Sequence, residues 1–104
     1  TEELSRELAL TILTLGHAGD GNIHVNVMLD RGNPEEEARG EAARQRLFTF
    51  VVGIGGTLSG EHGIGISKSS FLPLELSPVA LAVMRGLKNL FDPNGILNPG
   101  KIFP

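Results

Sequence analysis

The hydrophobic and polar residues near the start of the chain predict two short strands, and in the second they alternate with a period of two. Residues 9–15 read Ala-Leu-Thr-Ile-Leu-Thr-Leu, a short run rich in β-forming residues that predicts a strand. In residues 23–30, every second residue from Ile23 is aliphatic and lies on one face, while His24 and Asn26 lie on the other. This segment predicts a second strand, with an apolar face and a face that carries candidate chemistry.

Three further segments carry the signals of helices. Residues 1–8 are compatible with a short helix whose first residue, Thr1, is the N-cap. Asn33-Pro34, followed by three glutamates, predicts a second helix, because Asn caps, Pro suits the first helical position and acids complement the helix dipole. Glycines within residues 53–56 end this helix, and Ser77-Pro78 begins the last one.

Two of these helices carry apolar residues at helical spacing, which we expect to form core. Arg85 and Lys88 should face water, and residues 92–95 (Asp-Pro-Asn-Gly) should end the last helix in a turn. Residues 57–59 are compatible with a brief third strand. Together these elements predict an α+β fold, a small antiparallel sheet with helices packed on it. The apolar stripes are Ala43, Leu47, Phe50, Val51 and Ile54, then Ala80, Val83, Met84, Leu87, Leu90 and Phe91.

Composition narrows the class of protein. At 104 residues, the chain is long enough for one modest domain. Its hydrophobic share of 40% and charged share of 20% are typical of a globular domain. The net charge of −3, with both signs scattered, argues against a nucleic-acid partner. Without cysteine the chain has no disulfide, thiol nucleophile or iron–sulfur ligation, and no apolar run approaches the length that spans a bilayer.

The three histidines fall in two segments, and two of them flank a turn. If Asp20-Gly21 forms a two-residue turn, His17 lies directly opposite His24, with Cβ atoms about 4.5–5.5 Å apart. Two imidazoles at that separation can share one metal ion. Gly19 and Gly21 also permit a wider loop, and the alternative is a surface hairpin with two ordinary histidines. Asp20 is interpreted as a turn residue rather than a ligand.

A second segment, Ser-Gly-Glu-His-Gly-Ile-Gly at residues 59–65, contains Glu61 and His62. Adjacent side chains point apart in an extended segment, so Glu61 is interpreted as a third ligand and His62 as an acid–base group. Two histidines and one carboxylate leave coordination positions open for water or substrate. Asn26, on the same face as His24, would hydrogen-bond whatever the metal holds. The glycines would let backbone approach a ligand, or only make a tight loop.

Other features have simpler interpretations. The glycines at 53, 55 and 56 follow a helix and lack the context of a P-loop, so they are interpreted as a helix terminator. Lys68 is expected to be solvated, with an anion contact as the alternative. Ser59 lacks a nucleophile-elbow context.

Three motifs in order resemble one family. They are Gly-His-Ala-Gly-Asp-Gly-Asn-Ile-His at 16–24, Gly-Gly-Thr-Leu-Ser-Gly-Glu-His-Gly-Ile-Gly at 55–65, and Phe-Asp-Pro-Asn-Gly-Ile-Leu-Asn-Pro-Gly-Lys at 91–101. The chain is similar to the C-terminal domain of FAD-linked oxidases, the D-lactate dehydrogenase, D-2-hydroxyglutarate dehydrogenase and glycolate oxidase group of vanillyl-alcohol-oxidase-type flavoproteins. The resemblance implies part of a ferredoxin-like substrate domain that oxidises a 2-hydroxy acid, passing a hydride from the substrate Cα to FAD. It also implies a divalent metal, often zinc. By this resemblance, the family's metal ligands correspond to His17, His24 and Glu61. Its proton acceptor corresponds to His62, its substrate contact to Asn26, and a flavin contact to Asn98.

The same resemblance sets expectations about the parent protein. The chain begins at Thr1 without methionine, and the family carries an N-terminal FAD-binding domain, so residues 1–104 are interpreted as a C-terminal fragment of the substrate domain. We expect the fragment to be inactive alone, not to retain FAD, and to self-associate through exposed edges and apolar patches. The electron acceptor would be a quinone, a cytochrome, an electron-transfer flavoprotein or an iron–sulfur subunit. The location would be cytoplasmic or peripheral to a membrane in bacteria, and mitochondrial in eukaryotes.

Two alternatives remain at this point. One is a standalone metal-binding module whose 2-His-1-carboxylate set serves hydrolysis or non-haem iron oxygenation. The other is a non-catalytic domain with structural histidines. The C-terminal Asn-Pro-Gly-Lys segment favours the flavoenzyme, because a metal module has no evident use for it.

Overall fold

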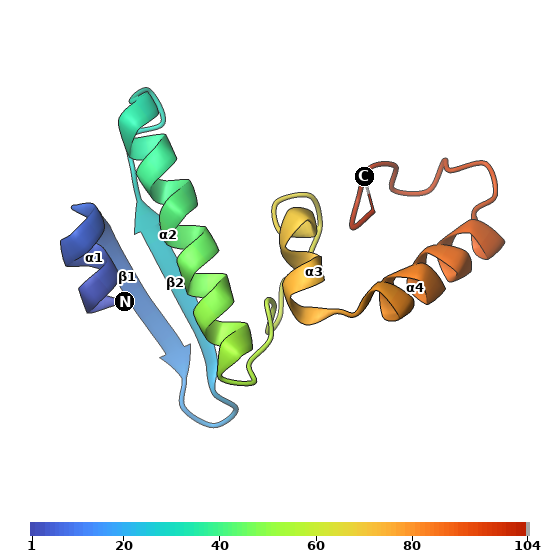
Figure 1. Ribbon diagram of the computed structural model, residues 1–104, viewed down its shortest axis with the longest axis horizontal. Helices are drawn as coiled ribbons and strands as arrows, with labels where there is room; N and C mark the ends of the chain where they lie inside the picture. Colours follow the sequence, from blue (N-terminus) through green and yellow to red (C-terminus); the bar gives the residue numbers. More distant parts are fainter. Residues whose placement is uncertain (104) are drawn as a thin grey trace. The chain divides into compact units, whose positions relative to one another are not determined.

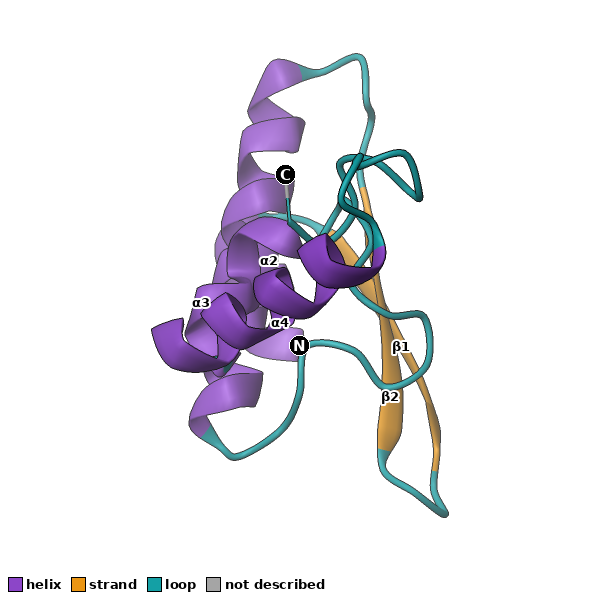
Figure 2. Ribbon diagram, turned by 90° about the vertical axis from the view of Figure 1, so that its right-hand side faces the viewer, coloured by secondary structure: helices purple, strands orange, loops and turns teal. Residues whose placement is uncertain are grey.

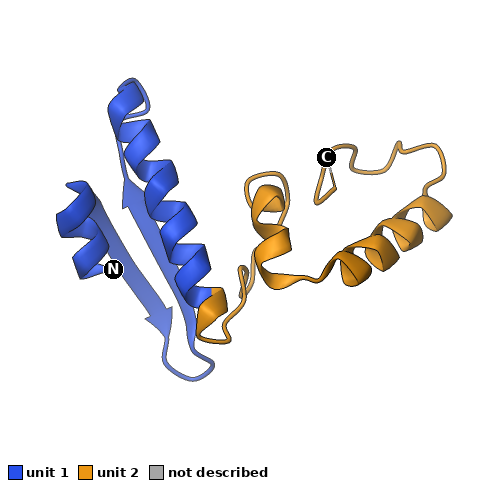
Figure 3. Cartoon of the chain, in the orientation of Figure 1, with its two compact units in different colours: residues 1–51 blue, residues 52–104 orange. Residues whose placement is uncertain are grey.

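The computed structural model describes residues 1–103, which fold as two compact units, residues 1–51 and the residues from 52 onward (Figure 3). The helices and the two-stranded antiparallel sheet of the described residues confirm the α+β class (Figure 1). None of the helices in this described part is both long and apolar enough to cross a membrane. In chain order the elements are α1 (Glu2–Leu8), β1 (Thr11–His17), β2 (Asn22–Met28), α2 (Pro34–Gly53), the 3₁₀ helix η1 (Ser69–Phe71), α3 (Leu72–Glu75) and α4 (Pro78–Phe91).

The β1–β2 hairpin has a different register from the expected one. His17 pairs with Asn22, and Leu15 pairs with His24, so four residues form the connection instead of two. Within it, the Gly21 N–H donates to the His17 carbonyl at 3.1 Å, and the Asn22 N–H donates to Asp20 Oδ1 at 3.1 Å. Gly21 has a φ of 72°, which a residue with a side chain rarely adopts. The expectation of a two-residue turn was therefore wrong, and the wider loop forms instead. Asp20 is a turn residue, as expected.

Helix α2 packs along the hairpin in the first unit, as Figures 1 and 2 both show. Its N-cap is confirmed, because Asn33 Oδ1 accepts the N–H groups of Glu35 at 3.0 Å and Glu36 at 3.4 Å. Gly40 of α2 is buried and lies so close to Leu29, just after β2, that a Cβ there would be 2.4 Å from a Leu29 methyl. The helix therefore backs the strand that carries His24.

Helix α1 is joined to both of its neighbours in the first unit. Arg46 of α2 forms an ion pair with Glu7 at 2.5 Å, and Ser5 Oγ donates to the Leu10 carbonyl at 2.6 Å. Leu10 and Ala43 are the buried apolar side chains of this unit. Thr1 occupies the N-cap position as expected, although its side chain makes no capping hydrogen bond.

The second unit is built around Leu58, Phe71 and Leu72, which are all buried. The brief strand expected at residues 57–59 is absent from the described structure, because the N–H and carbonyl of Leu58 bond to the side chains of Glu75 and Lys68 instead of to a strand. Lys68 was expected to be solvated, and its carbonyl contact corrects that expectation.

Helix α4 begins and ends as the sequence predicts. Ser77 Oγ accepts the Ala80 N–H at 3.2 Å, and the Gly95 N–H donates to the Asp92 carbonyl at 3.0 Å. The expectation that Met84 and Phe91 are core was wrong: Phe91 is 78% exposed, because no described element of its unit covers that stripe. The other exposed members of the two predicted stripes are Phe50, Ile54, Val83, Leu87 and Leu90.

Arg85 and Lys88 of α4 were expected to face water. Arg85 is exposed as expected, and its guanidinium lies 5.1 Å from the centroid of the Phe103 ring. The expectation was wrong for Lys88, which is half-buried in an ion pair with Asp92. Both cations therefore hold the segment that follows the helix, which the apolar periodicity of α4 does not reveal.

Candidate functional site

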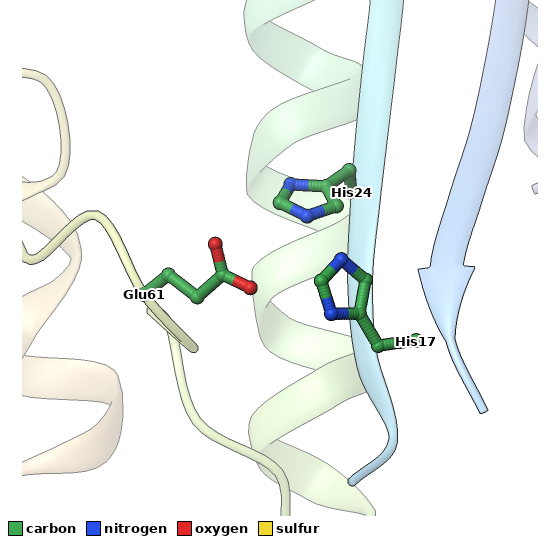
Figure 4. A group of neighbouring side chains, drawn as sticks. All are labelled: His17, His24 and Glu61. Atoms are coloured by element: carbon green, nitrogen blue, oxygen red, sulfur yellow. The ribbon is translucent and has the colours of Figure 1, made fainter. Parts of the chain in front are cut away.

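His17 and His24 converge on the hairpin by a diagonal contact. Because His17 pairs with Asn22, His24 lies two residues further along β2 on the same face. Long side chains at such diagonal positions are within reach of each other. Their ring centroids are 5.5 Å apart, with the ring planes inclined by 57°. The sequence thus predicted the right pair from the wrong register, and Figure 4 shows the two rings pointing toward each other.

The hairpin face that carries these imidazoles is the open one. His17 is exposed and His24 is half-buried, and Asn26, the next residue on this face of β2, is exposed. Val25 and Val27 on the opposite face are half-buried. The predicted division of β2 into an apolar face and a face with candidate chemistry is confirmed. A ligand held by the imidazoles would have Asn26 on the same surface.

Glu61 and His62 lie in an irregular loop of the second unit, and both are exposed. The loop is not extended, because Gly63 and Gly65 have φ values of 70° and 57°. The expectation that the two side chains point apart was therefore wrong. His62 Nε2 lies 3.8 Å from Glu61 Oε2, too long for a hydrogen bond but close enough for an ion pair when His62 is protonated.

Three side chains are candidate metal ligands. His17 and His24 each offer a ring nitrogen, and Glu61 offers a carboxylate oxygen. This donor set suits zinc, which binds imidazole nitrogen and carboxylate oxygen in proteins. Three protein ligands would leave a position open for water or substrate, as catalytic zinc sites do.

A cavity of about 360 Å³ adjoins Glu61 within the second unit. The loop contributes polar groups to it, and Leu72, Leu76 and Met84 contribute apolar surface. The Ser59 hydroxyl borders this cavity and is buried without a hydrogen-bond partner in the described structure. The cavity therefore has a polar edge and an apolar wall beside Glu61, the candidate metal ligand.

Asn98 follows a turn that Asp92 holds in place. Asp92 is buried, and its carboxylate accepts the N–H groups of Ile96 and Leu97, each at 3.0 Å, and an ion-pair hydrogen bond from Lys88. Lys88 also donates to the Leu97 carbonyl at 2.6 Å. The hydrogen bond from Lys88, and then those from the two backbone N–H groups, hold the pKa of Asp92 below its ordinary value, although burial opposes them.

The backbone beyond that turn is constrained as well. Asn98 is exposed and has a φ of 46°, an uncommon conformation for a residue with a side chain. From the sequence, Asp92 was expected only as a turn residue. The lysine four residues before it was the signal that could have revealed the larger role.

Comparison with known proteins places the chain in a family. The sequence model described as FAD linked oxidases, C-terminal domain, matches residues 1–102. The chain belongs to this family. A glycolate oxidase subunit GlcD of Bacillus subtilis is 41% identical over 97% of the chain. A D-lactate dehydrogenase of Archaeoglobus fulgidus is 45% identical over 98% of the chain. A D-2-hydroxyglutarate dehydrogenase of Stutzerimonas stutzeri is 40% identical over 88% of the chain.

The FAD-linked oxidase resemblance drawn from the three motifs is thereby confirmed. The chain spans about a fifth of the length of these relatives: 22%, 22% and 20% of the three proteins. The roles of the individual site residues stay predictions.

Proposed function

We propose that this domain supplies the metal ligands and the proton acceptor of a FAD-dependent 2-hydroxyacid dehydrogenase or oxidase. The observation that carries the proposal is the convergence of the His17 and His24 imidazoles, 5.5 Å apart on the open hairpin face. The names of the relatives support the substrate class, because glycolate, D-lactate and D-2-hydroxyglutarate are all 2-hydroxy acids.

His17, His24 and Glu61 would hold a divalent ion, with zinc best suited to the donor set. Such an ion, when bound, would lower the pKa of a hydroxyl group that it coordinates. Asn26 would donate a hydrogen bond from its amide to the substrate, because it shares the open face with His24.

His62 would accept the hydroxyl proton of the substrate, since the lone pair of a neutral imidazole nitrogen can take up a proton. Its side chain is exposed in the loop beside Glu61. FAD, when bound, would supply the acceptor for the hydride that leaves the substrate Cα. Asn98 would contact the flavin from the constrained turn after Asp92.

The proposal includes partners beyond this domain. An N-terminal FAD-binding domain would carry most of the flavin contacts, so the 104-residue chain alone should neither retain FAD nor turn over substrate. A quinone, cytochrome, electron-transfer flavoprotein or iron–sulfur subunit would take the electrons. The exposed apolar residues of α4, such as Leu90 and Phe91, would promote self-association of the isolated chain.

A metal titration tests the proposed roles. Zinc affinity should be lost in His17→Ala, His24→Ala and Glu61→Ala, and kept in His62→Ala. Equal loss in all four variants would contradict the assignment. Titration with ferrous iron addresses the rival function, a 2-His-1-carboxylate hydrolase or non-haem iron oxygenase, which would need metal-dependent activity without flavin.

A further inference from the structure

We propose that Glu75 and Lys68 are positioning residues for the loop that carries Glu61 and His62. Together they hold the backbone of Leu58, three residues before Glu61. This inference rests on the proposed function, because it assigns a purpose to the rigidity of a loop whose ligand and base are themselves proposed.

Glu75, at the end of α3, uses both carboxylate oxygens to bind Thr57 and Leu58, just before the loop. Its Oε1 accepts the Thr57 hydroxyl at 2.8 Å, and its Oε2 accepts the Leu58 N–H at 2.9 Å. Lys68 Nζ donates to the Leu58 carbonyl at 2.9 Å. Both backbone polar groups of Leu58 are thus bonded to charged side chains, and bonds to charged groups are stronger than neutral ones.

Packing fixes the same residue through its side chain. Leu58 is 3% exposed, and the other buried apolar residues of this unit are Phe71 and Leu72, which lie next to each other at the η1–α3 junction. The backbone of Leu58 is held by groups on either side of that junction, since Lys68 precedes it and Glu75 follows it. The start of the loop is therefore anchored by hydrogen bonds and by burial.

The far end of the loop is anchored separately. The Ile102 N–H donates to the Gly65 carbonyl at 2.8 Å. Between Leu58 and Gly65, the chain contains two further glycines and no helix or strand. Glycine-rich backbone loses more conformational entropy on ordering than other residues do. A loop already fixed at both ends loses less of that entropy when Glu61 binds a ligand.

Charge placement supports a role beyond filling space. Lys68 is half-buried and directs its ammonium group to a neutral carbonyl, although it could extend into water. Glu75 is an exposed residue, yet both of its carboxylate oxygens accept hydrogen bonds, one from Thr57 and one from Leu58. The two side chains thus converge on one short stretch of backbone, directly before the glycine-rich loop.

Zinc affinity is the readout for this inference, measured by calorimetric titration of the purified chain against a competing chelator. Glu75→Ala should weaken zinc binding by about 10-fold, the lower end of the effect of supporting residues around metal ligands. Glu75→Gln should restore affinity, because its amide can accept the Leu58 N–H and donate to the Thr57 hydroxyl. Lys68→Met should weaken binding as well, and Glu37→Ala, at an exposed acid in α2, should have no effect.

Far-UV circular dichroism of each variant identifies those that retain the fold. A folded Glu75→Ala variant with unchanged zinc affinity would overturn the inference. Should Glu75→Ala unfold, Thr57→Val and Lys68→Met decide, because each removes one hydrogen bond, and unchanged affinity in both would overturn it. Failure of the proposed function has a different signature, namely zinc affinity that survives Glu61→Ala or is absent from the unmodified chain.

Discussion

Replacing Gly40 with alanine tests the packing of α2 against the strand that carries His24. A Cβ at Gly40 would lie 2.4 Å from Leu29 Cδ2, far closer than two carbon atoms can approach. In an unhindered helix, Gly→Ala would stabilise the protein by about 1 kcal/mol through helix propensity. The atom that clashes is the end of the half-buried Leu29 side chain, which can rotate away, so the overlap should cost about 1–2 kcal/mol, the lower part of the range for overpacking. The balance predicts that Gly40→Ala lowers the free energy of unfolding by about 0–1 kcal/mol instead of raising it by about 1 kcal/mol.

A double-mutant cycle separates the two contributions. Urea unfolding, followed by circular dichroism, would give the free energy of unfolding of the unmodified chain, Gly40→Ala, Leu29→Ala and the double variant. Without the Leu29 methyls the overlap disappears, so Gly40→Ala should then stabilise by about 1 kcal/mol, a coupling of about 1–2 kcal/mol. Equal stabilisation by Gly40→Ala in both backgrounds would refute the contact between α2 and the end of β2.

Substitutions at three further residues test the cap of α4, the turn after it and the proposed base. Ser77→Ala should lower the free energy of unfolding by about 1 kcal/mol, because it removes the cap of α4, and Ser77→Asp should restore it in the same urea assay. The Asp92 pKa is lowered in the folded state, so its stabilisation should be complete above the ordinary carboxyl pKa and lost as the pH falls through the lowered value. Asp92→Asn should flatten that acid limb in thermal unfolding measured at several pH values; an unchanged limb would contradict the role of Asp92. In a flavoprotein that contains this domain, His62→Ala should slow turnover by about 100-fold or more while zinc content is retained, and loss of zinc instead would make His62 a ligand.

The sequence was most informative where structure is decided locally. Asn33-Pro34 and Ser77-Pro78 predicted the starts of α2 and α4, because a capping side chain acts on N–H groups two or three residues away. Alternation along β2 predicted which face carries His24, because the pleat fixes side-chain direction. The closeness of His17 and His24 was also predicted correctly, since both lie on that face near the turn, and their role as metal ligands stays a prediction.

The sequence was least informative where long-range contacts decide. Hairpin register depends on loop length, and Gly21 made the four-residue connection as accessible as the two-residue turn. Helix α3 was missed because it is a single short turn that begins at the buried Leu72. Periodicity in α4 predicted an apolar stripe correctly, but it could not tell whether another element covers residues such as Phe91. The roles of Glu75 and Lys68 depend on contacts 17 and 10 residues apart, which no local pattern reveals.

The central claim is that His17, His24 and Glu61 bind a divalent metal, and elemental analysis of the purified chain tests it most directly. After purification without chelators, the account predicts close to stoichiometric zinc or another divalent metal, without flavin absorbance. The same content should be found in His62→Ala, and it should be lost in His24→Ala. A chain that contains no metal, even after reconstitution with zinc, or a His24→Ala variant that keeps its full metal content, would contradict the account.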